Sequence, residues 1–303
     1  MTQNILVELS DALADAAEKA GKATVLVNAR RRMPASGIAY AADLVLTADH
    51  IVEREDDIKV MLADGTEIPA KVAGRDAGSD LAVLKLERAV APVAEVTKSP
   101  ARLGQIALVL GRPSPNGIEA SLGTVSAIGG PIRTGRGGML ERYIRTDSIS
   151  YPGFSGGPLV AADGTVLGIN TSGLANGAAI TIPAEIAWKI AETLVKHGRV
   201  KRGYLGIRSQ TVEISAASQK ALKREQATGL LIVGVENDSP ASKGGFIVGD
   251  ILVAVAGAPV LHHDELFTRL TGDVVDVSTG KSTPIEILRG GQPQTLNVQV
   301  GER

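Results

Sequence analysis

Short apolar runs, separated by glycine, proline and aspartate, follow one another along most of the chain. Short runs rich in Val, Ile and Leu, with turn residues between them, predict β-strands. We expect strands over residues 24–28, 43–47, 58–62, 81–84, 105–110, 121–128, 143–146 and 165–170. Asp64-Gly65 and Asp163-Gly164 have the dipeptide that favours two-residue hairpins. Regular strands with little helix between them indicate antiparallel β-barrels.

Two segments depart from this strand pattern, because their apolar residues recur at helical spacing. In the first segment these residues are Ile5, Leu6, Leu9, Leu13 and Ala16. In the second they are Ile186, Ala187, Ile190, Ala191 and Leu194. Gly21 is expected to end the first helix, while Pro183 suits the first turn of the second helix and Gly198 its end. We therefore predict an N-terminal helix over residues 1–21 and a first domain over residues 22–198.

A short basic linker at residues 199–202 precedes a second predicted domain, residues 203–303. Its apolar runs predict strands at 230–235, at 251–255 and near 296–300, and a helix near 264–270. His262-His263-Asp264-Glu265 holds metal-ligating residue types, but immediate neighbours do not share one face of a helix. We therefore expect a helix start capped by Asp264 here, and no metal site.

Composition narrows the class of protein. The 303 residues are 44% hydrophobic and 21% charged, which suits a packed globular core. A formal net charge of −1 provides no general attraction for nucleic acid or anionic membranes. The chain has no cysteine, which excludes disulfides, thiolate catalysis and cysteine-based zinc sites.

The start of the chain bears on its location. No apolar run approaches the roughly 18 residues of a transmembrane helix. The first residues lack a basic segment and are interrupted by Glu8, Asp11 and Asp15, unlike a signal peptide. We expect a cytoplasmic protein, with a periplasmic or other extracytoplasmic location as the alternative if the native start is missing.

The candidate chemistry centres on Ser155, in the segment Tyr151-Pro-Gly-Phe-Ser-Gly-Gly-Pro-Leu-Val160. A serine hydroxyl becomes a useful nucleophile when a base takes its proton and backbone N–H groups hold the oxyanion that forms. The glycines around Ser155 allow the backbone to turn such N–H groups inward. His50 ends one hydrophobic strand and Asp80 begins another, so the chain order is His50, Asp80, Ser155, as in the chymotrypsin triad.

Two other interpretations of these residues were weighed. Asp76 is a nearby competitor for the role of Asp80, but the apolar run after Asp80 predicts a strand that would bury this carboxylate firmly. Gly153-Phe-Ser-Gly-Gly157 also matches the G-x-S-x-G elbow of α/β-hydrolases. That elbow needs a helix after the serine, whereas Pro158-Leu-Val160 predicts a strand.

The three segments together resemble the HtrA (Deg) family of trypsin-like serine proteases. That family has T-x-x-H-V-V around the histidine, S-D-L-A-V-L-K around the aspartate and G-N-S-G-G-P-L around the serine. Here the matching segments are Leu44-Val-Leu-Thr-Ala-Asp-His50, Ser79-Asp-Leu-Ala-Val-Leu-Lys-Leu86 and the Ser155 segment. Arg202-Gly-Tyr-Leu-Gly-Ile207 resembles the opening of the family's PDZ domain, and residues 229–260 resemble its body.

The resemblance implies a mainly β fold: a chymotrypsin-like pair of six-stranded barrels with the triad between them, followed by a PDZ domain. It implies that Tyr204, Leu205, Gly206 and Ile207 bind the carboxylate end of a peptide, with Leu266 and Leu270 as further candidates for the pocket. The N–H groups of Gly153 and Ser155 would form the oxyanion hole. Residues 150–151 and 168–181 would wall the primary pocket, where Ile169, Leu174, Ala178 and Ala179 favour small or medium aliphatic side chains over Lys or Arg.

The expected function is a serine endopeptidase that degrades unfolded or damaged polypeptides without a cofactor, with a PDZ domain that binds chain ends. Two features depart from the family. Phe154 replaces the usual Asn, and a bulky ring at the cleft could alter loop order or substrate access. No aromatic residue precedes Tyr40, whereas HtrA trimers use aromatic contacts there, so a homo-oligomer need not be that trimer. The alternative function is a non-catalytic peptide-binding or chaperone-like protein in which Phe154 distorts the oxyanion hole.

Overall fold

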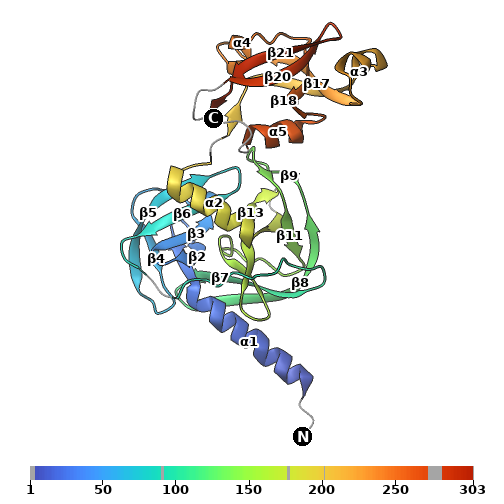
Figure 1. Ribbon diagram of the computed structural model, residues 1–303. Coiled ribbons are helices and arrows are strands. Elements are labelled where there is room, and N and C mark those ends of the chain that lie inside the picture. Colours follow the sequence, from blue (N-terminus) through green and yellow to red (C-terminus); the bar gives the residue numbers. More distant parts are fainter. Residues whose placement is uncertain (1–3, 90–91, 176–177, 201, 272–281, 303) are drawn as a thin grey trace. The chain divides into compact units, whose positions relative to one another are not determined.

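The computed structural model describes residues 4–89, 92–175, 178–200, 202–271 and 282–302. The chain forms two compact units, residues 1–200 and residues 201–303. The first unit contains two closed six-stranded barrels, and the second contains a sheet with three short helices (Figure 1). The predicted mainly β fold, a chymotrypsin-like pair of barrels followed by a PDZ domain, is confirmed.

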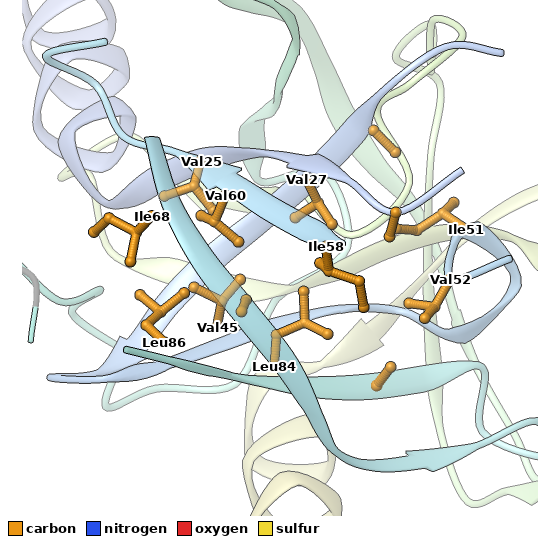
Figure 2. Close-up of a cluster of buried hydrophobic side chains, with 14 of the residues drawn as sticks. Val25, Val27, Val45, Ile51, Val52, Ile58, Val60, Ile68, Leu84 and Leu86 are labelled. Atoms are coloured by element: carbon orange, nitrogen blue, oxygen red, sulfur yellow. The ribbon is translucent and has the colours of Figure 1, made fainter. Parts of the chain in front are cut away.

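The first barrel has the strand order β1-β2-β3-β6-β5-β4. Its strands are β1 (Thr24–Asn28), β2 (Ala35–Ala41), β3 (Leu44–Ala48), β4 (Ile58–Met61), β5 (Glu67–Asp76) and β6 (Leu81–Leu86). Burial alternates along β4 and along the first half of β5, as expected where one strand face covers a core. The inward side chains of all six strands form one cluster of valines, isoleucines, leucines and alanines (Figure 2). Burying each such side chain stabilises the fold by about 1.5–3 kcal/mol.

The second barrel has the strand order β11-β14-β13-β12-β7-β8. Its strands are β7 (Ile106–Ser114), β8 (Gly117–Gly129), β11 (Tyr143–Thr146), β12 (Pro158–Ala161), β13 (Val166–Ala175) and β14 (Ala178–Pro183). Between β8 and β11 the chain forms a small hairpin from β9 (Ile132–Arg133) and β10 (Met139–Leu140). β12 follows the Ser155 turn directly, so the helix that the α/β-hydrolase interpretation requires is absent at this point.

Both Asp-Gly hairpins have three-residue loops rather than the predicted two-residue loops. The N–H of Leu62 donates to Thr66 O, which leaves residues 63–65 in the loop, and Gly65 has φ +84°. The N–H of Ala161 donates to Thr165 O in the same way, and Gly164 has φ +78°. A glycine in the left-handed region at the last loop position is typical of a type I turn with a G1 bulge. The dipeptide therefore marks the hairpin correctly but not its length.

Helix α1 (Ile5–Ala23) packs on the second barrel, where Ala16 and Ala20 meet Leu108, Leu110 and Val160. Its first residues extend beyond the barrels (Figure 1), where Ile5 and Leu6 are exposed. The prediction that Gly21 ends this helix is wrong, because α1 continues to Ala23. A Cβ at Gly21 would lie 2.7 Å from Ile118 Cδ1, so this glycine permits close packing rather than a stop.

Helix α2 (Ala184–His197) has its apolar face in the core cluster that joins the two barrels. Pro183 and Gly198 lie at its two caps, as predicted, and Gly198 has φ +75°. α2 crosses β5 closely: a Cβ at Gly74 would lie 2.4 Å from Leu194 O. A side chain at Gly74 would therefore push the helix off the strand.

The second unit has its main sheet in the order β16-β17-β18-β20-β21. These strands are β16 (Ile207–Glu213), β17 (Thr228–Val235), β18 (Ile251–Val255), β20 (Ser282–Arg289) and β21 (Gln292–Gln299). β15 (Gly203–Tyr204) pairs with β22 (Gly301–Glu302), and β19 (Ala258–Pro259) pairs with β18. The helices are α3 (Ala216–Leu222), α4 (Pro240–Lys243) and α5 (His263–Thr271). α5 begins one residue before the predicted cap, Asp264.

Candidate active site

His50 lies in a single 3₁₀ turn, η1 (Asp49–Ile51), at the end of β3. The next two side chains, Ile51 and Val52, are buried in the core of the first barrel (Figure 2). This anchoring holds the turn against the barrel while His50 itself stays partly exposed. The strand-then-histidine pattern therefore has a direct structural reason.

Asp80 contacts His50 at two points. Its Oδ2 lies 2.8 Å from His50 Nδ1, and its Oδ1 accepts a hydrogen bond of 2.9 Å from the backbone N–H of His50. The carboxylate is fully buried at the start of β6, and Asp80 has φ +55°, a left-handed conformation that Asp tolerates better than most residues. The two-point contact fixes both the ring and the backbone of His50 relative to one carboxylate.

Asp76, the competing carboxylate, has a different role. Its Oδ2 accepts a hydrogen bond of 2.8 Å from the N–H of Ser79. The N–H of Asp80 in turn donates to Ala77 O at 3.3 Å, and the N–H of Asp49 donates to Asp80 O at 3.0 Å. Asp76 thus shapes the turn that presents Asp80.

Two arginines add positive charge beside this pair. Arg136 Nη1 lies 2.9 Å from Asp49 Oδ2 and 3.8 Å from Asp80 Oδ1, while Arg75 Nε lies 2.6 Å from Asp49 Oδ1. Burial disfavours the charged form of Arg75, but the hydrogen bond and the charge of Asp49 raise its pKa above the usual value. The buried Asp49 carboxylate is therefore paired on both sides, which links the β9–β10 hairpin to the His50 turn.

Four consecutive residues of β13 contact the site. Asn170 O accepts the N–H of Gly156 at 2.8 Å, and Thr171 Oγ1 donates to Asp80 Oδ2. Ser172 Oγ lies 3.2 Å from Ser155 Oγ. A Cβ on Gly173 would lie 2.4 Å from Asp80 Oδ2 and 2.7 Å from His50 Nδ1. Adjacent residues of this one strand segment therefore contact Ser155 and lie against the His50–Asp80 pair.

The sequence pattern places these β13 residues only within the range 168–181 that is expected to wall the primary pocket. It predicts no contact of Thr171, Ser172 or Gly173 with His50, Asp80 or Ser155. A signal was present, because three small or polar residues there interrupt an otherwise apolar strand. Their partners, however, come from distant segments.

Ser155 follows a tight turn. The N–H of Phe154 donates to Tyr151 O at 3.0 Å, and Pro152 and Gly153 occupy the two central positions, with Gly153 at φ +89°. Pro followed by a glycine of positive φ is the combination that a type II turn favours. Among the residues that the structure describes, no group accepts a hydrogen bond from the N–H of Gly153 or of Ser155. The turn therefore leaves available the two donors that an oxyanion would need.

The ring of Phe154 is not at the cleft. It is fully buried in the core of the second barrel, with Val109 and Leu159 in the same cluster. Its ring lies edge-on to Tyr151, with centroids 5.4 Å apart. Gly111 makes the space, because a Cβ there would lie 2.5 Å from Phe154 Cδ1. The expectation of a bulky ring at the cleft is wrong, since the side chain points into the barrel.

The residues expected to line the primary pocket do not share one environment. Ile169 and Leu174 are buried in the core cluster that joins the barrels, and Ala179 is exposed. The side chain of Ala178 lies outside the described residues. Two of the four residues thus pack inside the protein.

In the second unit, Tyr204 and Leu205 precede a turn at Gly206, which has φ +76°. Leu205 O accepts the N–H of Ala241 at 2.8 Å, and Gly206 O accepts the N–H of Glu236 at 2.8 Å. Leu205, Leu266 and Leu270 share one buried cluster, against which Ile207 packs. Hydrogen bonds to the rest of the second unit therefore hold the carbonyl groups of both Leu205 and Gly206.

No helix within the described part of the chain is long and apolar enough to cross a membrane.

In the His262-His263-Asp264-Glu265 segment, two side chains form hydrogen bonds within the second unit. His263 Nε2 lies 3.0 Å from Ser209 O, and the carboxylate of Glu265 accepts a hydrogen bond from the N–H of Leu261.

Comparison with known proteins agrees with this architecture. Residues 35–169 match the model of the trypsin-like peptidase domain, and residues 203–300 match that of the PDZ domain. "Probable periplasmic serine endoprotease DegP-like" of Pseudomonas putida is 35% identical over 273 residues, 88% of this chain and 55% of that protein. The protein of the same name from Rhizobium meliloti is 33% identical over 280 residues, 90% of this chain and 54% of that protein. The chain thus spans about half the length of these curated relatives.

Solved structures match over nearly the whole chain. "HtrA-type protease AlgW with decapeptide" has a TM-score of 0.79 and 28% identity, with 96% of this chain and 98% of that chain covered. A serine endoprotease from Yersinia pestis has a TM-score of 0.78 and 28% identity, with the same coverage. "HtrA-type protease AlgWS227A with tripeptide" is 30% identical, with 96% of this chain and 97% of that chain covered and a TM-score of 0.80. With these relatives, two barrels and a PDZ domain, the chain belongs to the HtrA (DegP-like) family of serine proteases.

Proposed function

We propose that this chain is a serine endopeptidase that hydrolyses peptide bonds of unfolded or damaged polypeptides through His50, Asp80 and Ser155. The observation that carries the proposal is the two-point contact between His50 and the fully buried Asp80. A carboxylate held on Nδ1 leaves Nε2 as the base and stabilises the imidazolium that forms. Ser172 and Gly173, adjacent in β13, touch Ser155 and the His50–Asp80 pair respectively, which supports their acting together.

The reaction then proceeds in two halves. Ser155 Oγ attacks the scissile carbonyl carbon, its proton passes to His50 Nε2, and the carbonyl oxygen becomes an oxyanion. His50 returns the proton to the leaving amine as the C–N bond breaks, which leaves an acyl-enzyme. A water molecule, deprotonated by His50, releases the acid by the same route. No cofactor takes part in these steps.

The N–H groups of Gly153 and Ser155 are proposed to hold the oxyanion. Their lack of an acceptor among the described residues supports this role. Loss of one such donor typically costs about 3–4 kcal/mol of barrier. The buried position of Phe154 speaks against the distorted hole on which the non-catalytic alternative depends.

We assign peptide binding in the second unit to the Tyr204-Leu205-Gly206-Ile207 loop. Backbone N–H groups of such a loop can hold a terminal carboxylate while the peptide adds a strand to a sheet edge. Among the described residues, β16, which follows the loop, pairs only with β17. Its other edge, where His263 Nε2 contacts Ser209 O, is the edge to which a peptide strand would add. The chain should bind a peptide with a free C-terminus more tightly than the same peptide with an amidated C-terminus, as measured by fluorescence anisotropy, and equal binding of the two peptides would contradict the assignment.

The primary specificity is proposed to favour small or medium aliphatic residues before the cleaved bond. Paired fluorogenic peptides with Val or Arg at that position test the assignment. Faster cleavage of the Val peptide supports it, and a preference for Arg would refute it.

The limits of the first domain (22–198), the linker (199–202) and the second domain (203–303) belong to the same proposal, whereas the N-terminal helix predicted over 1–21 extends to Ala23. The compartment and the oligomeric state are predictions of the same kind. Cell fractionation measures the compartment: the cytoplasm is one prediction, and an extracytoplasmic location, which the relatives named as periplasmic support, is the alternative. Light scattering measures whether the chain forms a homo-oligomer.

Casein degradation and labelling by a fluorophosphonate test the catalytic proposal. The wild-type chain should do both, and Ser155→Ala should do neither while its thermal unfolding stays unchanged. Ser172→Ala is the matched variant, since it removes the neighbouring hydroxyl and should remain labelled. A folded wild-type chain that is inert in both assays would favour the non-catalytic alternative.

A further inference from the structure

Ser36, on β2 of the first barrel, contacts the Ser155 turn of the second barrel at both ends. Its Oγ donates a hydrogen bond of 2.7 Å to Gly153 O, and its N–H donates one of 3.2 Å to Ser155 O. The side chain is fully buried. One residue therefore binds the carbonyl groups of both residues whose N–H groups are assigned to the oxyanion hole.

The direction of the Ser36 hydroxyl is determined by its other partner. The backbone N–H of Arg112 lies 2.8 Å from Ser36 Oγ and can only donate. The single hydroxyl proton of Ser36 is therefore left for Gly153 O. Thr47 Oγ1 donates to Ser36 O at 2.7 Å, so the strand on which the hydroxyl sits is itself held.

This contact determines how the peptide between Gly153 and Phe154 is oriented. Its carbonyl is bound by Ser36 and its N–H by Tyr151 O, so neither end is free to rotate. The N–H of Gly153 belongs to the preceding peptide, between Pro152 and Gly153, which is joined to the held peptide through Gly153 Cα. Holding the one peptide limits rotation about Gly153 and so limits the directions of its N–H, which meets no acceptor among the described residues. If Ser36 lost its hydroxyl, this peptide would gain freedom because the glycine at φ +89° readily adopts other conformations.

The two glycines after Ser155 also lie close to Ser36. A Cβ on Gly156 would lie 2.1 Å from Ser36 O, and a Cβ on Gly157 would lie 3.2 Å from Ser36 Cβ. The segment after the nucleophile is therefore packed directly on Ser36. Both the hydrogen bonds and the close packing join the turn to the other barrel at this point.

We propose that Ser36 is a positioning residue for catalysis, which holds the oxyanion hole in its binding-competent form through Gly153 O. The inference rests on the proposed function, because it concerns the assigned hole. It predicts a loss in kcat with little change in KM, since ground-state binding does not use the oxyanion. Direct loss of one hole donor costs about 100- to 1000-fold in kcat, so loss of a supporting contact should cost about 10- to 100-fold.

The test uses the full chain with Ser36→Ala and a fluorogenic peptide substrate. We expect kcat to fall about 10- to 100-fold, with KM within about twofold of the wild-type value. Thr24→Val is the matched control: Thr24 is equally buried, and its hydroxyl bonds Ala20 O at 2.9 Å, away from the turn. Thr24→Val should keep the wild-type kcat, and an equal loss in both variants would overturn the proposal.

A second measurement separates positioning from general damage. A peptide aldehyde forms a bond from its carbonyl carbon to Ser155 Oγ, the serine proton passes to His50, and the carbonyl oxygen becomes the oxyanion. The same peptide ending in a primary alcohol binds without this step. In Ser36→Ala the aldehyde should lose affinity by the same factor as kcat, while the alcohol binds as in the wild type. Equal losses for both inhibitors would overturn the assignment.

Because Ser36→Ala leaves buried groups unpaired, the folded fraction is measured by circular dichroism, and Ser36→Cys serves where Ala unfolds the chain. A thiol keeps the shape of the side chain but donates weakly, so kcat should still fall. Wild-type kcat in either folded variant overturns this inference alone. An inert wild-type chain overturns the proposed function and this inference together.

Discussion

Among single residues, Gly173 contributes by having no side chain. The His50–Asp80 pair lies directly against it, and a Cβ there would come within 2.4 Å of Asp80 Oδ2. The contacted atoms are functional groups that are themselves hydrogen-bonded, so they cannot move aside without losing their geometry. Space at this position is therefore a requirement of the site as much as the reacting groups are.

Gly173→Ala should lower kcat/KM by at least about 100-fold, because displacement of the base by about 1 Å can cost that factor. Activity on casein and a fluorogenic peptide measures the effect. Gly65→Ala is the control: Gly65 has φ +84° in the β4–β5 hairpin with no atom near the added Cβ. It should lower stability yet keep its specific activity, whereas an active Gly173→Ala would contradict the geometry.

Among the elements, α2 is placed by its contact with β5. Gly74 allows the strand to approach the last turn of the helix, and the N–H of Arg75 donates to Gly198 O at 3.1 Å. α2 also contributes Ala187, Ala191 and Leu194 to the core that joins both barrels. Displacing this helix would therefore loosen the core that joins the two barrels.

Gly74→Ala should destabilise the first unit by several kcal/mol, because the added methyl meets backbone oxygens rather than a flexible side chain. Urea unfolding measures the loss. Gly198→Ala isolates the strain of the left-handed cap, with no atom near its Cβ, and should cost only about 1 kcal/mol. Equal losses in the two variants would contradict the proposed close approach.

For the molecule as a whole, we expect three carboxylates in turns to contribute to stability in a pH-dependent way. A backbone hydrogen bond from Thr66 lowers the pKa of Asp64, one from Thr124 lowers the pKa of Asp147, and the hydroxyl of Thr165 lowers the pKa of Asp163. A group with a lower pKa in the folded state stabilises the fold above its unfolded pKa, here 3.8. That contribution is lost as the pH falls through the folded pKa.

The combined variant Asp64→Asn, Asp147→Asn, Asp163→Asn should therefore be less stable than the wild type at pH 6. The gap between the two should narrow as the pH falls from about 5 to 3. Melting temperatures across this range provide the measurement. A gap that stays constant with pH would show that these carboxylates do not titrate differently in the two states.

The sequence by itself determined the elements and the chemistry that lies within short segments. Apolar runs predicted the strands, helical spacing predicted both long helices of the first unit, and the His50, Asp80 and Ser155 motifs predicted the family. Two predictions about where an element ends were wrong: Gly21 does not end its helix, and the Asp-Gly hairpins have loops of three residues instead of two. A glycine or an Asp-Gly pair marks an allowed conformation, and its neighbours decide which conformation is used.

Only the tertiary structure decided which distant groups meet. Nothing in the sequence around Thr171 and Gly173 indicates that β13 lies against Asp80. In the same way, nothing around Ser36 indicates that β2 lies against the Ser155 turn. The burial of Phe154 likewise depends on the space left by Gly111 in a neighbouring strand. Contacts between segments far apart in the sequence, such as the 91 residues between Asp80 and Thr171 or the 117 between Ser36 and Gly153, follow from how the barrels close and pack. No local pattern of residues encodes that packing.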